Sequence, residues 1–179
     1  MGCGTGGFAR LLAERAESVL GLDLAPQMIA TARERSVGKT NLEFIVADAL
    51  RWDYPAERFD CVASIATLHH LPLEAMLERF RHTLGPGGVL VVLDLASDAG
   101  VADWPFSLLA VLANLALRLR HAGRLREPAE VRAAWAEHGA GERYLTVPQV
   151  RAVAERVLPG AHVRRHLLWR YSLIWRKGR

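Results

Sequence analysis

The sequence predicts an α/β protein with a doubly wound, mostly parallel sheet. Short β-rich runs alternate with runs of helical spacing as far as residue 95, a pattern that indicates βαβ units. The run 89–95, VLVVLDL, is almost wholly apolar, so we expect a strand that is buried on both faces. At 179 residues and 51% hydrophobic composition, the chain is long enough for one domain with a real core.

The first 95 residues are expected to alternate strand and helix without interruption. The second helix begins at Pro26, a favourable first helical position, and the third ends before the glycine-rich stretch 85–88. In chain order we expect a helix at 8–16, a strand at 18–24, a helix at 26–35, strands at 42–48 and 59–65, a helix at 72–84 and a strand at 89–95.

After residue 95 the pattern changes. Residues 96–145 are mostly helical in spacing, and 146–158 form a helix with Thr146 as its N-cap. The runs 162–169 and 171–177 are joined too closely for a crossover helix, so they should form an antiparallel pair. We therefore expect a single domain over 1–179, made of a first half (1–95), a variable helical region (96–145) and a closing helix with two strands (146–179).

Charge and cysteine content exclude several classes of function. All but Lys39 and Lys177 of the 23 basic residues are arginine, which is typical of a GC-rich genome, so a net charge of +4 is no evidence for nucleic-acid binding. Cys3 and Cys61 form neither a disulfide framework nor a metal motif, and we expect no metal. No signal peptide is seen, which favours the cytoplasm. Nothing indicates the oligomeric state.

The opening MGCGTGGFAR places glycines at positions 2, 4 and 6 before a helical segment. Glycine permits a tight turn and close approach to a ligand, and the helix N-terminus favours electron-rich groups. Because Gly7 also fits G-x-G-x-x-G, the turn alone is equally typical of dinucleotide-binding enzymes.

Two acids end the next two strands. At the carboxyl edge of a parallel sheet, Asp23 can accept both hydroxyls of a ribose, and the alternative is a loop acid that caps the following helix. Asp48 can accept the exocyclic amine of an adenine, with backbone amides near Ala49 on a ring nitrogen, and its alternative is a surface loop acid. Both features are shared with nicotinamide-dependent enzymes.

The segments FDCVASIATLHHL and LGPGGVLVVLDL, with GCGTGG, GLDLAPQM and VADA, resemble in order and spacing the class I S-adenosylmethionine-dependent methyltransferases. The likeness is to the small-molecule group (type 11/25-like) that includes quinone and natural-product enzymes. It covers residues 1–95 and extends to the closing helix and strand pair. It implies a Rossmann-like sheet of order 3-2-1-4-5-7-6, with strand 7 antiparallel, and S-adenosyl-L-methionine as cofactor.

The resemblance also assigns residues to the cofactor. The glycine turn would line its methionine part, and the end of the strand 59–65 would close over it. The expected cofactor-binding residues are Gly2, Cys3, Gly4, Thr5, Gly6, Asp23 (ribose), Leu24 and Met28 (beside the adenine), Asp48 and Ala49 (adenine edge), and Ser64 and Ile65.

The expected reaction is methyl transfer by direct in-line displacement to a small, lipophilic or aromatic acceptor, on oxygen or carbon. A general base is needed only where the acceptor loses a proton, and His69 and His70 are the candidates, with simple packing as the alternative. Asp94 would orient an acceptor or cap a loop. Two other functions stay open: an NAD(P)-dependent Rossmann oxidoreductase, against which the scarcity of lysine counts, and an inactive, truncated methyltransferase-like domain.

The apolar stretch 105–121 has three interpretations: a buried lid over a hydrophobic acceptor, core packing, or an interfacial helix in contact with a membrane. We favour the lid and place membrane contact last. The side chains that would line the acceptor pocket are Trp104, Phe106, Trp135 and Tyr144; the polar stripe of this helix is Ser107, Asn114, Arg118 and His121; and the basic anchors of an interfacial helix would be Arg118, Arg120, Arg124 and Arg126.

One family element is absent. Family members have an apolar strand directly before G-C-G-T-G, and here Met1 stands where a branched apolar residue is expected. The missing strand 1 is central, between strands 2 and 4. Our hypothesis is that the chain starts too late, at a GTG valine codon taken for the start. Because the loss opens the sheet, we expect a weak or inactive fragment.

Overall fold

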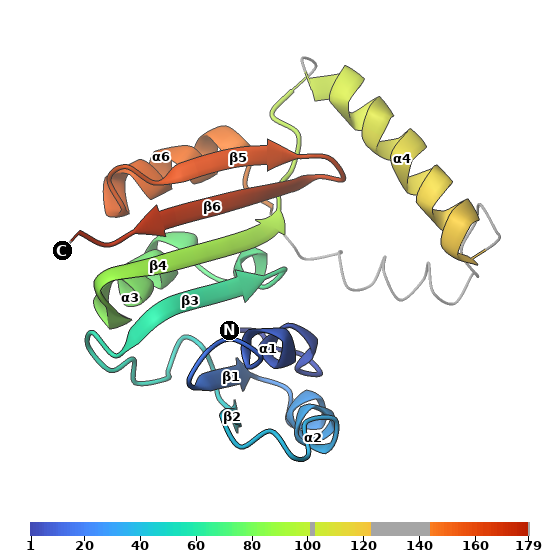
Figure 1. Cartoon of the computed structure of the whole chain (residues 1–179). Helices are drawn as coiled ribbons and strands as arrows, with labels where there is room; N and C mark the ends of the chain where they lie inside the picture. The colour runs from blue at the N-terminus through green and yellow to red at the C-terminus, as the bar shows by residue number, and fades with distance from the viewer. Residues whose placement is uncertain (101–102, 123–143, 179) are drawn as a thin grey trace.

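The structure is a computed structural model that describes residues 1–100, 103–122 and 144–178 (Figure 1). Every helix and strand predicted outside 96–145 is present, although α1 ends four residues earlier than expected. In chain order the elements are α1 (Gly7–Leu12), β1 (Val19–Asp23), α2 (Pro26–Glu34), β2 (Leu42–Val46), β3 (Phe59–Ile65), η1 (Leu68–His70), α3 (Leu73–Thr83), β4 (Leu84–Leu95), α4 (Trp104–Ala122), α6 (Val147–Val157), β5 (His162–His166) and β6 (Arg170–Arg176).

The strands form two sheets that lie side by side. β1 and β2 pair in parallel, and the second sheet has the order β3-β4-β6-β5, with β6 antiparallel to both of its neighbours. In the strand order that the resemblance implies, 3-2-1-4-5-7-6, β1 corresponds to strand 2 and β3 to strand 4, so strand 1 would lie between β1 and β3. No strand of the described residues takes that place (Figure 1). Within each of the two sheets the order of the strands agrees with the predicted order.

The core is divided in the same way as the sheet. A large cluster of buried side chains joins α3, β4, α6 and β6, with Met76, Phe80 and Leu90 fully buried. A small cluster, Ala9, Ile29, Ala32 and Phe44, lies between the first two helices and the β1–β2 pair. Each part of the sheet thus carries a core of its own.

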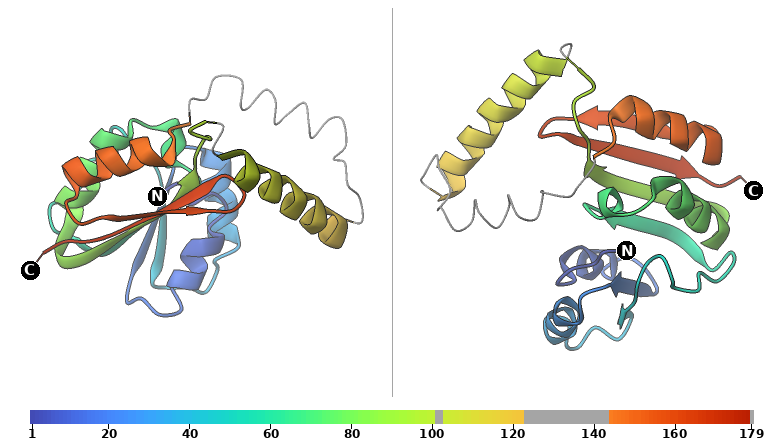
Figure 2. Two further views of the ribbon diagram at one scale, coloured as in Figure 1. Left: turned by 90° about the horizontal axis from the view of Figure 1, so that it is seen from above. Right: turned by 180° about the vertical axis from the view of Figure 1, so that it is seen from behind.

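The expectation that 89–95 is buried on both faces is wrong. Leu90 and Val92 are fully buried beneath α3 and α6, whereas Val91 is 36% exposed and its partner Ile174 on β6 is 47% exposed. α3 and α6 lie together on one face of the sheet (Figure 2). No helix of the described ranges covers Val91 and Ile174 from the other face, which explains the alternation.

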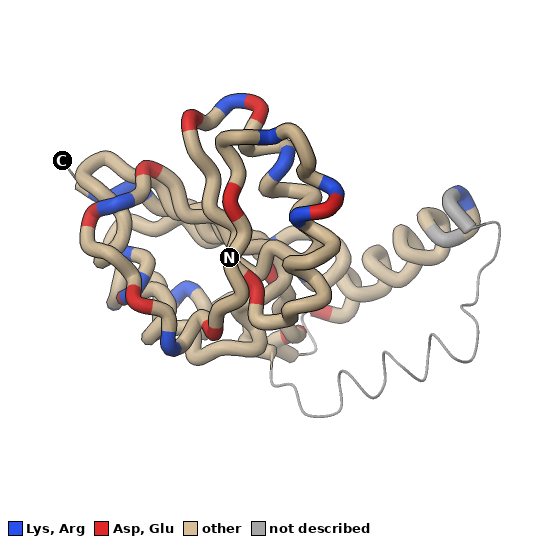
Figure 3. The backbone as a smooth tube through the Cα atoms, turned by 90° about the horizontal axis from the view of Figure 1, so that it is seen from below, with Lys and Arg blue, Asp and Glu red and all other residues tan. Residues whose placement is uncertain are grey.

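The expectation of a buried helix over 105–121 is also wrong. α4 projects away from the sheet (Figures 1 and 2). Three of its large apolar side chains, Leu108, Leu109 and Leu112, are more than half exposed. Figure 3 shows it without charge along most of its length, while acidic and basic residues are interspersed over the rest of the molecule. No described helix is long and apolar enough to cross a membrane.

The base of α4 is held by polar contacts to β5 and its neighbourhood. Arg165 forms ion pairs with Asp98 (2.8 Å) and Asp103 and lies over the ring of Phe106. The ring of Phe106, predicted to line an acceptor pocket, is therefore in contact with Arg165. Trp104, predicted for the same pocket, is 70% exposed. Arg124, Arg126 and Trp135, and the side chains of Arg118 and His121, lie outside the described residues.

The closing segment forms as predicted. Thr146 is the N-cap of α6: its hydroxyl accepts a hydrogen bond from the Gln149 amide at 3.4 Å, and the Gln149 side chain accepts one from the Thr146 amide at 2.9 Å. This capping box satisfies amide groups that the first helical turn leaves without partners. β5 and β6 pair antiparallel, with His162 opposite Ile174 at one end of the ladder and His166 opposite Arg170 at the other.

Candidate active site at the carboxyl edge of the sheet

The glycine turn and the first acid meet at the carboxyl edge of β1. The Gly4 amide donates to Asp23 Oδ2 at 2.8 Å, and the Ala25 amide donates to Asp23 Oδ1 at 3.0 Å. Asp23 is half-buried and stands opposite Val46, the last residue of β2. The carboxylate therefore fixes the turn at this edge, and each of its oxygens keeps a lone pair for a further donor.

Gly2 joins this turn to the end of β3. Its φ is +62°, and a Cβ built on it would lie 2.0 Å from Thr67 Oγ1, so no side chain is possible without moving Thr67. Gly4 is the opposite case, because its φ is +50° and a Cβ at this position would have nothing within 4 Å. The turn thus packs tightly against β3 at Gly2 and leaves open space at Gly4, with Cys3 and Thr5 half-buried on either side.

Exposed apolar side chains accompany the two acids. Leu24 and Met28, which follow Asp23 in sequence, are 68% and 41% exposed. Asp48 accepts from the Leu50 amide at 2.8 Å and lies 3.7 Å from Arg51. The edge therefore combines carboxylates with accessible apolar surface, as a nucleoside requires.

Ala49 is half-buried and Ser64 is buried. The Ala49 carbonyl accepts from the Tyr54 hydroxyl at 3.1 Å, and Ala49 packs against the large core. Ser64 is 1% exposed, and its Oγ has no hydrogen-bond partner among the described residues. Its neighbour Ile65 is 36% exposed. An unpaired buried hydroxyl costs free energy, so Ser64 is a candidate for contact with a bound ligand.

His69 and Asp94 form a buried pair between η1 and the end of β4. His69 Nδ1 lies 2.5 Å from Asp94 Oδ1, with 6% and 0% of the two side chains exposed. Asp94 also accepts from the amides of Thr67 (3.1 Å) and Leu68 (2.5 Å). Burial by itself would raise the pKa of Asp94, but the hydrogen bonds from His69 and the amides of Leu95 and Leu68 outweigh it, and its pKa stays below the ordinary value.

The two histidines therefore differ, which the sequence did not indicate. His69 is held by Asp94, while His70 is exposed and stacks on the His69 ring at 4.0 Å between centroids. Tyr144 lies on the His69 ring at 5.3 Å. Of the two roles expected for Asp94, loop capping is present, and its pairing with His69 was missed because 25 residues separate them.

A small cavity of about 190 Å³ adjoins His69. Its lining is otherwise almost wholly apolar and includes Leu71, Leu95, Leu145 and Tyr171. The pKa of Tyr171 is raised above its ordinary value by burial and by the Asp94 charge, so its hydroxyl stays protonated. Among the described residues no group of three or more His, Cys, Asp or Glu is arranged to hold a metal ion.

Comparison with known proteins shows which families and structures this chain resembles. Residues 1–88 match a family model described as a methyltransferase domain. Over 97 residues the chain is 38% identical to phosphoethanolamine N-methyltransferase 3 of Arabidopsis thaliana. The aligned segment covers 52% of this chain and 20% of that protein. Over 96 residues it is 34% identical to 2-methyl-6-phytyl-1,4-hydroquinone methyltransferase of Synechocystis sp., with 52% and 30% covered. The chain spans less than a third of the length of these relatives.

A solved structure extends the likeness to the whole chain. Haemonchus contortus phosphoethanolamine N-methyltransferase 2, in complex with phosphomonomethylethanolamine and S-adenosylhomocysteine, superposes with a TM-score of 0.72. The match covers 99% of this chain and 48% of that one, at 16% sequence identity. At this identity the likeness shows the fold alone.

Proposed function

We propose that this chain, whose first 88 residues belong to the methyltransferase domain family of class I, is an S-adenosylmethionine-dependent methyltransferase for a small, lipophilic or aromatic acceptor. The observation that carries the proposal is the joint placement of the glycine turn, Asp23 and the His69–Asp94 pair at one edge of the sheet. S-adenosylmethionine supplies an electrophilic methyl group on a sulfonium centre.

The residues at the edge fit this cofactor. Gly2, Gly4 and Gly6, with Cys3 and Thr5, would follow its amino-acid part, and Asp23 would accept the ribose hydroxyls. The exposed Leu24 and Met28 would cover the adenine, whose amine Asp48 would accept beside Ala49. The unpaired Ser64 hydroxyl, with Ile65, would close over the methionine part.

His69 is the residue we assign to proton removal. Asp94 orients the His69 ring through Nδ1, and a ring held in this way would serve as the base for an acceptor hydroxyl. The Asp94 carboxylate would then stabilise the imidazolium that forms. His70, exposed and stacked on His69, would pack against the base and would not itself be one.

The cavity beside His69 supports the acceptor class. Its lining of Leu71, Leu95, Leu145 and the Tyr171 ring would favour an aromatic or alkyl group over an ionic one. A phenolic hydroxyl suits this position, because its loss of a proton is the step that a histidine base assists. Transfer to the oxygen or to a ring carbon of such an acceptor is compatible with the same pocket.

Equilibrium dialysis with S-adenosylhomocysteine tests cofactor binding through two matched glycine substitutions. Gly4 and Gly38 both have positive φ (+50° and +87°), and a Cβ added at either position would have no atom within 4 Å. Alanine at either position should therefore cost a similar free energy of unfolding, about 1–2 kcal/mol. Gly4→Ala should weaken binding by at least tenfold, and Gly38→Ala should leave it unchanged. Equal affinity in the two variants would reject the glycine turn as the binding site.

A paired acceptor assay tests the substrate class. The chain is incubated with labelled S-adenosylmethionine and either a methyl-substituted hydroquinone or phosphoethanolamine, the two chemistries named by its relatives. We expect label in the hydroquinone and none in phosphoethanolamine. Transfer to phosphoethanolamine alone would contradict the apolar acceptor pocket while leaving methyl transfer intact.

A further inference from the structure

The cavity beside His69 contains a polar group to which the proposed function gives no role, the hydroxyl of Tyr171. Tyr171 is 3% exposed and lines this cavity. Its hydroxyl makes no hydrogen bond to any described residue. Among the described residues, Ser64 Oγ is the side-chain atom that is both fully enclosed and unpaired, so the Tyr171 oxygen, which is unpaired as well, keeps accessible surface. The cavity is the space in which that surface lies.

Asp94 is the nearest charged acceptor for this hydroxyl, because it stands opposite Tyr171 in the β4–β6 ladder. Its lone pairs are already used. Four donors bond to it: His69 Nδ1 and the Leu95 amide at Oδ1, and the amides of Thr67 and Leu68 at Oδ2. A carboxylate offers about four lone-pair positions, so none is left for Tyr171. Burial and the Asp94 charge raise the pKa of Tyr171, and the hydroxyl therefore stays a donor that lacks an acceptor.

The walls of the cavity are held by backbone contacts and by the core. The Ser97 amide donates to the Leu145 carbonyl at 3.1 Å, and Ser97 Oγ donates to the Tyr144 carbonyl at 2.9 Å. These bonds fix the segment that precedes α6. Leu73 of α3 and Val150 of α6, both buried, form the wall on the helix side. A cavity whose walls are fixed in this way selects its ligand by size.

The volume of the cavity, about 190 Å³, matches one aromatic ring. An apolar protein cavity of about 150 Å³ accommodates benzene. The space that remains admits small substituents on the ring but not a second fused ring.

Building on the proposed methyl transfer, we propose that this cavity binds an acceptor with a single aromatic ring, and that Tyr171 donates a hydrogen bond to a second polar atom of that acceptor. This second atom is an uncharged oxygen or nitrogen, because the Asp94 charge lies close by. It differs from the atom that receives the methyl group, since a donor on the attacking atom would occupy the lone pair that the attack requires. Tyr171 thus determines which rings are bound, and His69 serves the attacking atom.

Three uncharged probes test ring binding without methyl transfer. Acetophenone carries a carbonyl that can accept from Tyr171, α-methylstyrene has the same planar shape with a CH₂ group in place of the oxygen, and 2-acetylnaphthalene adds a second fused ring. Dissociation constants are measured by NMR on protein with labelled leucine methyl groups, in the absence of S-adenosylmethionine. The methyl signals of Leu71 and Leu145, which both line the cavity, show that a probe is bound there.

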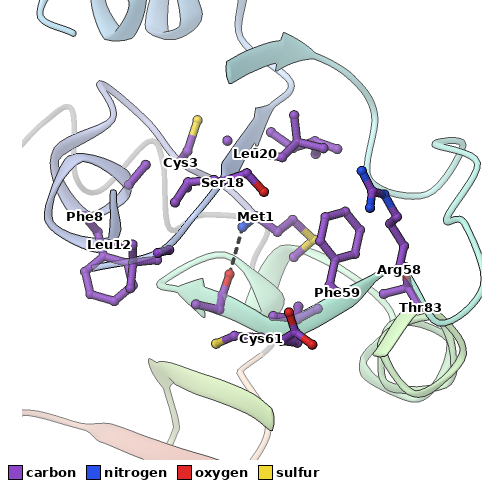
Figure 4. Close-up of a pocket in the computed structure, with 18 of the residues that line it drawn as sticks. Met1, Cys3, Phe8, Leu12, Ser18, Leu20, Arg58, Phe59, Cys61 and Thr83 are labelled. Carbon is purple, nitrogen blue, oxygen red and sulfur yellow. Dashed lines mark hydrogen bonds between the residues drawn. The ribbon is translucent and has the colours of Figure 1, made fainter. Parts of the chain in front are cut away.

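Tyr54→Phe is the matched control for Tyr171→Phe. Tyr54 is 9% exposed, and its hydroxyl donates to the Ala49 carbonyl at 3.1 Å. It lines a separate cavity of about 620 Å³ between β1 and β3, where Met1 and Phe59 are among the other lining residues (Figure 4). The two cavities have no described lining residue in common. Removal of the Tyr54 hydroxyl should therefore leave all three dissociation constants unchanged.

We expect Tyr171→Phe to weaken acetophenone binding about fivefold, the worth of one neutral hydrogen bond, and to leave α-methylstyrene binding unchanged. In the wild type, 2-acetylnaphthalene should bind more weakly than acetophenone by about tenfold or more, because it overfills the cavity. In the acceptor assay, the second hydroxyl of the hydroquinone is the atom that Tyr171 would contact. There Tyr171→Phe should raise KM about fivefold with little change in kcat, as expected when binding alone is lost.

Four results would overturn the proposal. These are unmoved Leu71 and Leu145 signals up to the solubility limit of acetophenone, an equal effect of Tyr171→Phe on acetophenone and α-methylstyrene, equal affinity for acetophenone and 2-acetylnaphthalene, and an equal loss in Tyr54→Phe. The second would show that the hydroxyl only fills space, and the third that the cavity is not limited to one ring. A failure of the proposed function looks different, because the probes would then bind with the expected preferences while no acceptor is methylated.

Discussion

The Ser64 hydroxyl lies buried at the end of β3 without a hydrogen-bond partner among the described residues, an arrangement that folding by itself does not favour. Alanine at this position would keep the backbone and remove only the unpaired group. A residue that serves the ligand and not the fold should separate affinity from stability.

We therefore predict that Ser64→Ala leaves the ligand-free chain as stable as before or more stable by about 1 kcal/mol, because no hydrogen bond is lost. The same variant should bind S-adenosylhomocysteine several-fold more weakly. Urea unfolding and calorimetric titration measure the two quantities. Unchanged affinity would remove Ser64 from the site, and a large loss of stability would reveal a structural partner.

Sequence patterns found the residue types of the site but not their pairing. The acids at the strand ends were predictable because parallel strands bring their carboxyl ends to one edge. The difference between His69 and His70 was not predictable, since it depends on how the chain turns after β3 and on a buried acid from another strand. Adjacent residues in one short turn face different surroundings, and only the fold decides which of them is buried.

The His69–Asp94 pair makes a pH prediction. A carboxyl whose pKa is lower in the folded state contributes stability above its unfolded value, near 4, and this stability is lost as the pH falls through the folded pKa. Asp94→Asn should lose about 2–3 kcal/mol of unfolding free energy at pH 7 and show a shallower loss toward acid. Asp60→Asn, which alters an exposed acid of β3, is the control. If both variants behave as the wild type in urea unfolding from pH 7 to 3, Asp94 has no such role.

At the scale of elements, local sequence signals were sufficient to predict where helices and strands begin and end when those limits depend only on nearby residues. The alternation of strands and helices, the start of α2 at Pro26 and the cap at Thr146 were all readable from the sequence. Burial was less so. Val91 is apolar yet 36% exposed, and most large apolar residues of α4 are exposed, because composition says what a side chain tolerates and not which helix lies over it.

The capping box of α6 allows a matched test. Thr146→Ala removes the hydroxyl that accepts from the Gln149 amide and should lower the free energy of unfolding by about 1 kcal/mol. Thr146→Ser keeps that hydroxyl and should stay within a few tenths of the wild type. Urea unfolding of the three proteins measures the difference. A serine variant as unstable as the alanine variant would show that the lost contact is the threonine methyl group.

For the whole molecule, the interrupted sheet is the dominant feature. The glycine turn and Asp23 belong to the part with the small core, while Ser64, His69 and Asp94 belong to the part with the large one. These parts meet at Gly2 against Thr67 and at the bond from the Met1 amino group to the Ala63 carbonyl. A ligand that contacts both sides of this junction should stabilise the molecule as a unit.

The most direct measurement is therefore thermal unfolding with and without S-adenosylhomocysteine, followed by circular dichroism. At a hundred times its dissociation constant, a ligand that binds only the folded chain adds about 2.7 kcal/mol. We predict one cooperative transition that moves to higher temperature with S-adenosylhomocysteine and does not move with NADH. A cooperative transition that ignores S-adenosylhomocysteine at millimolar concentration would contradict the cofactor site at the carboxyl edge.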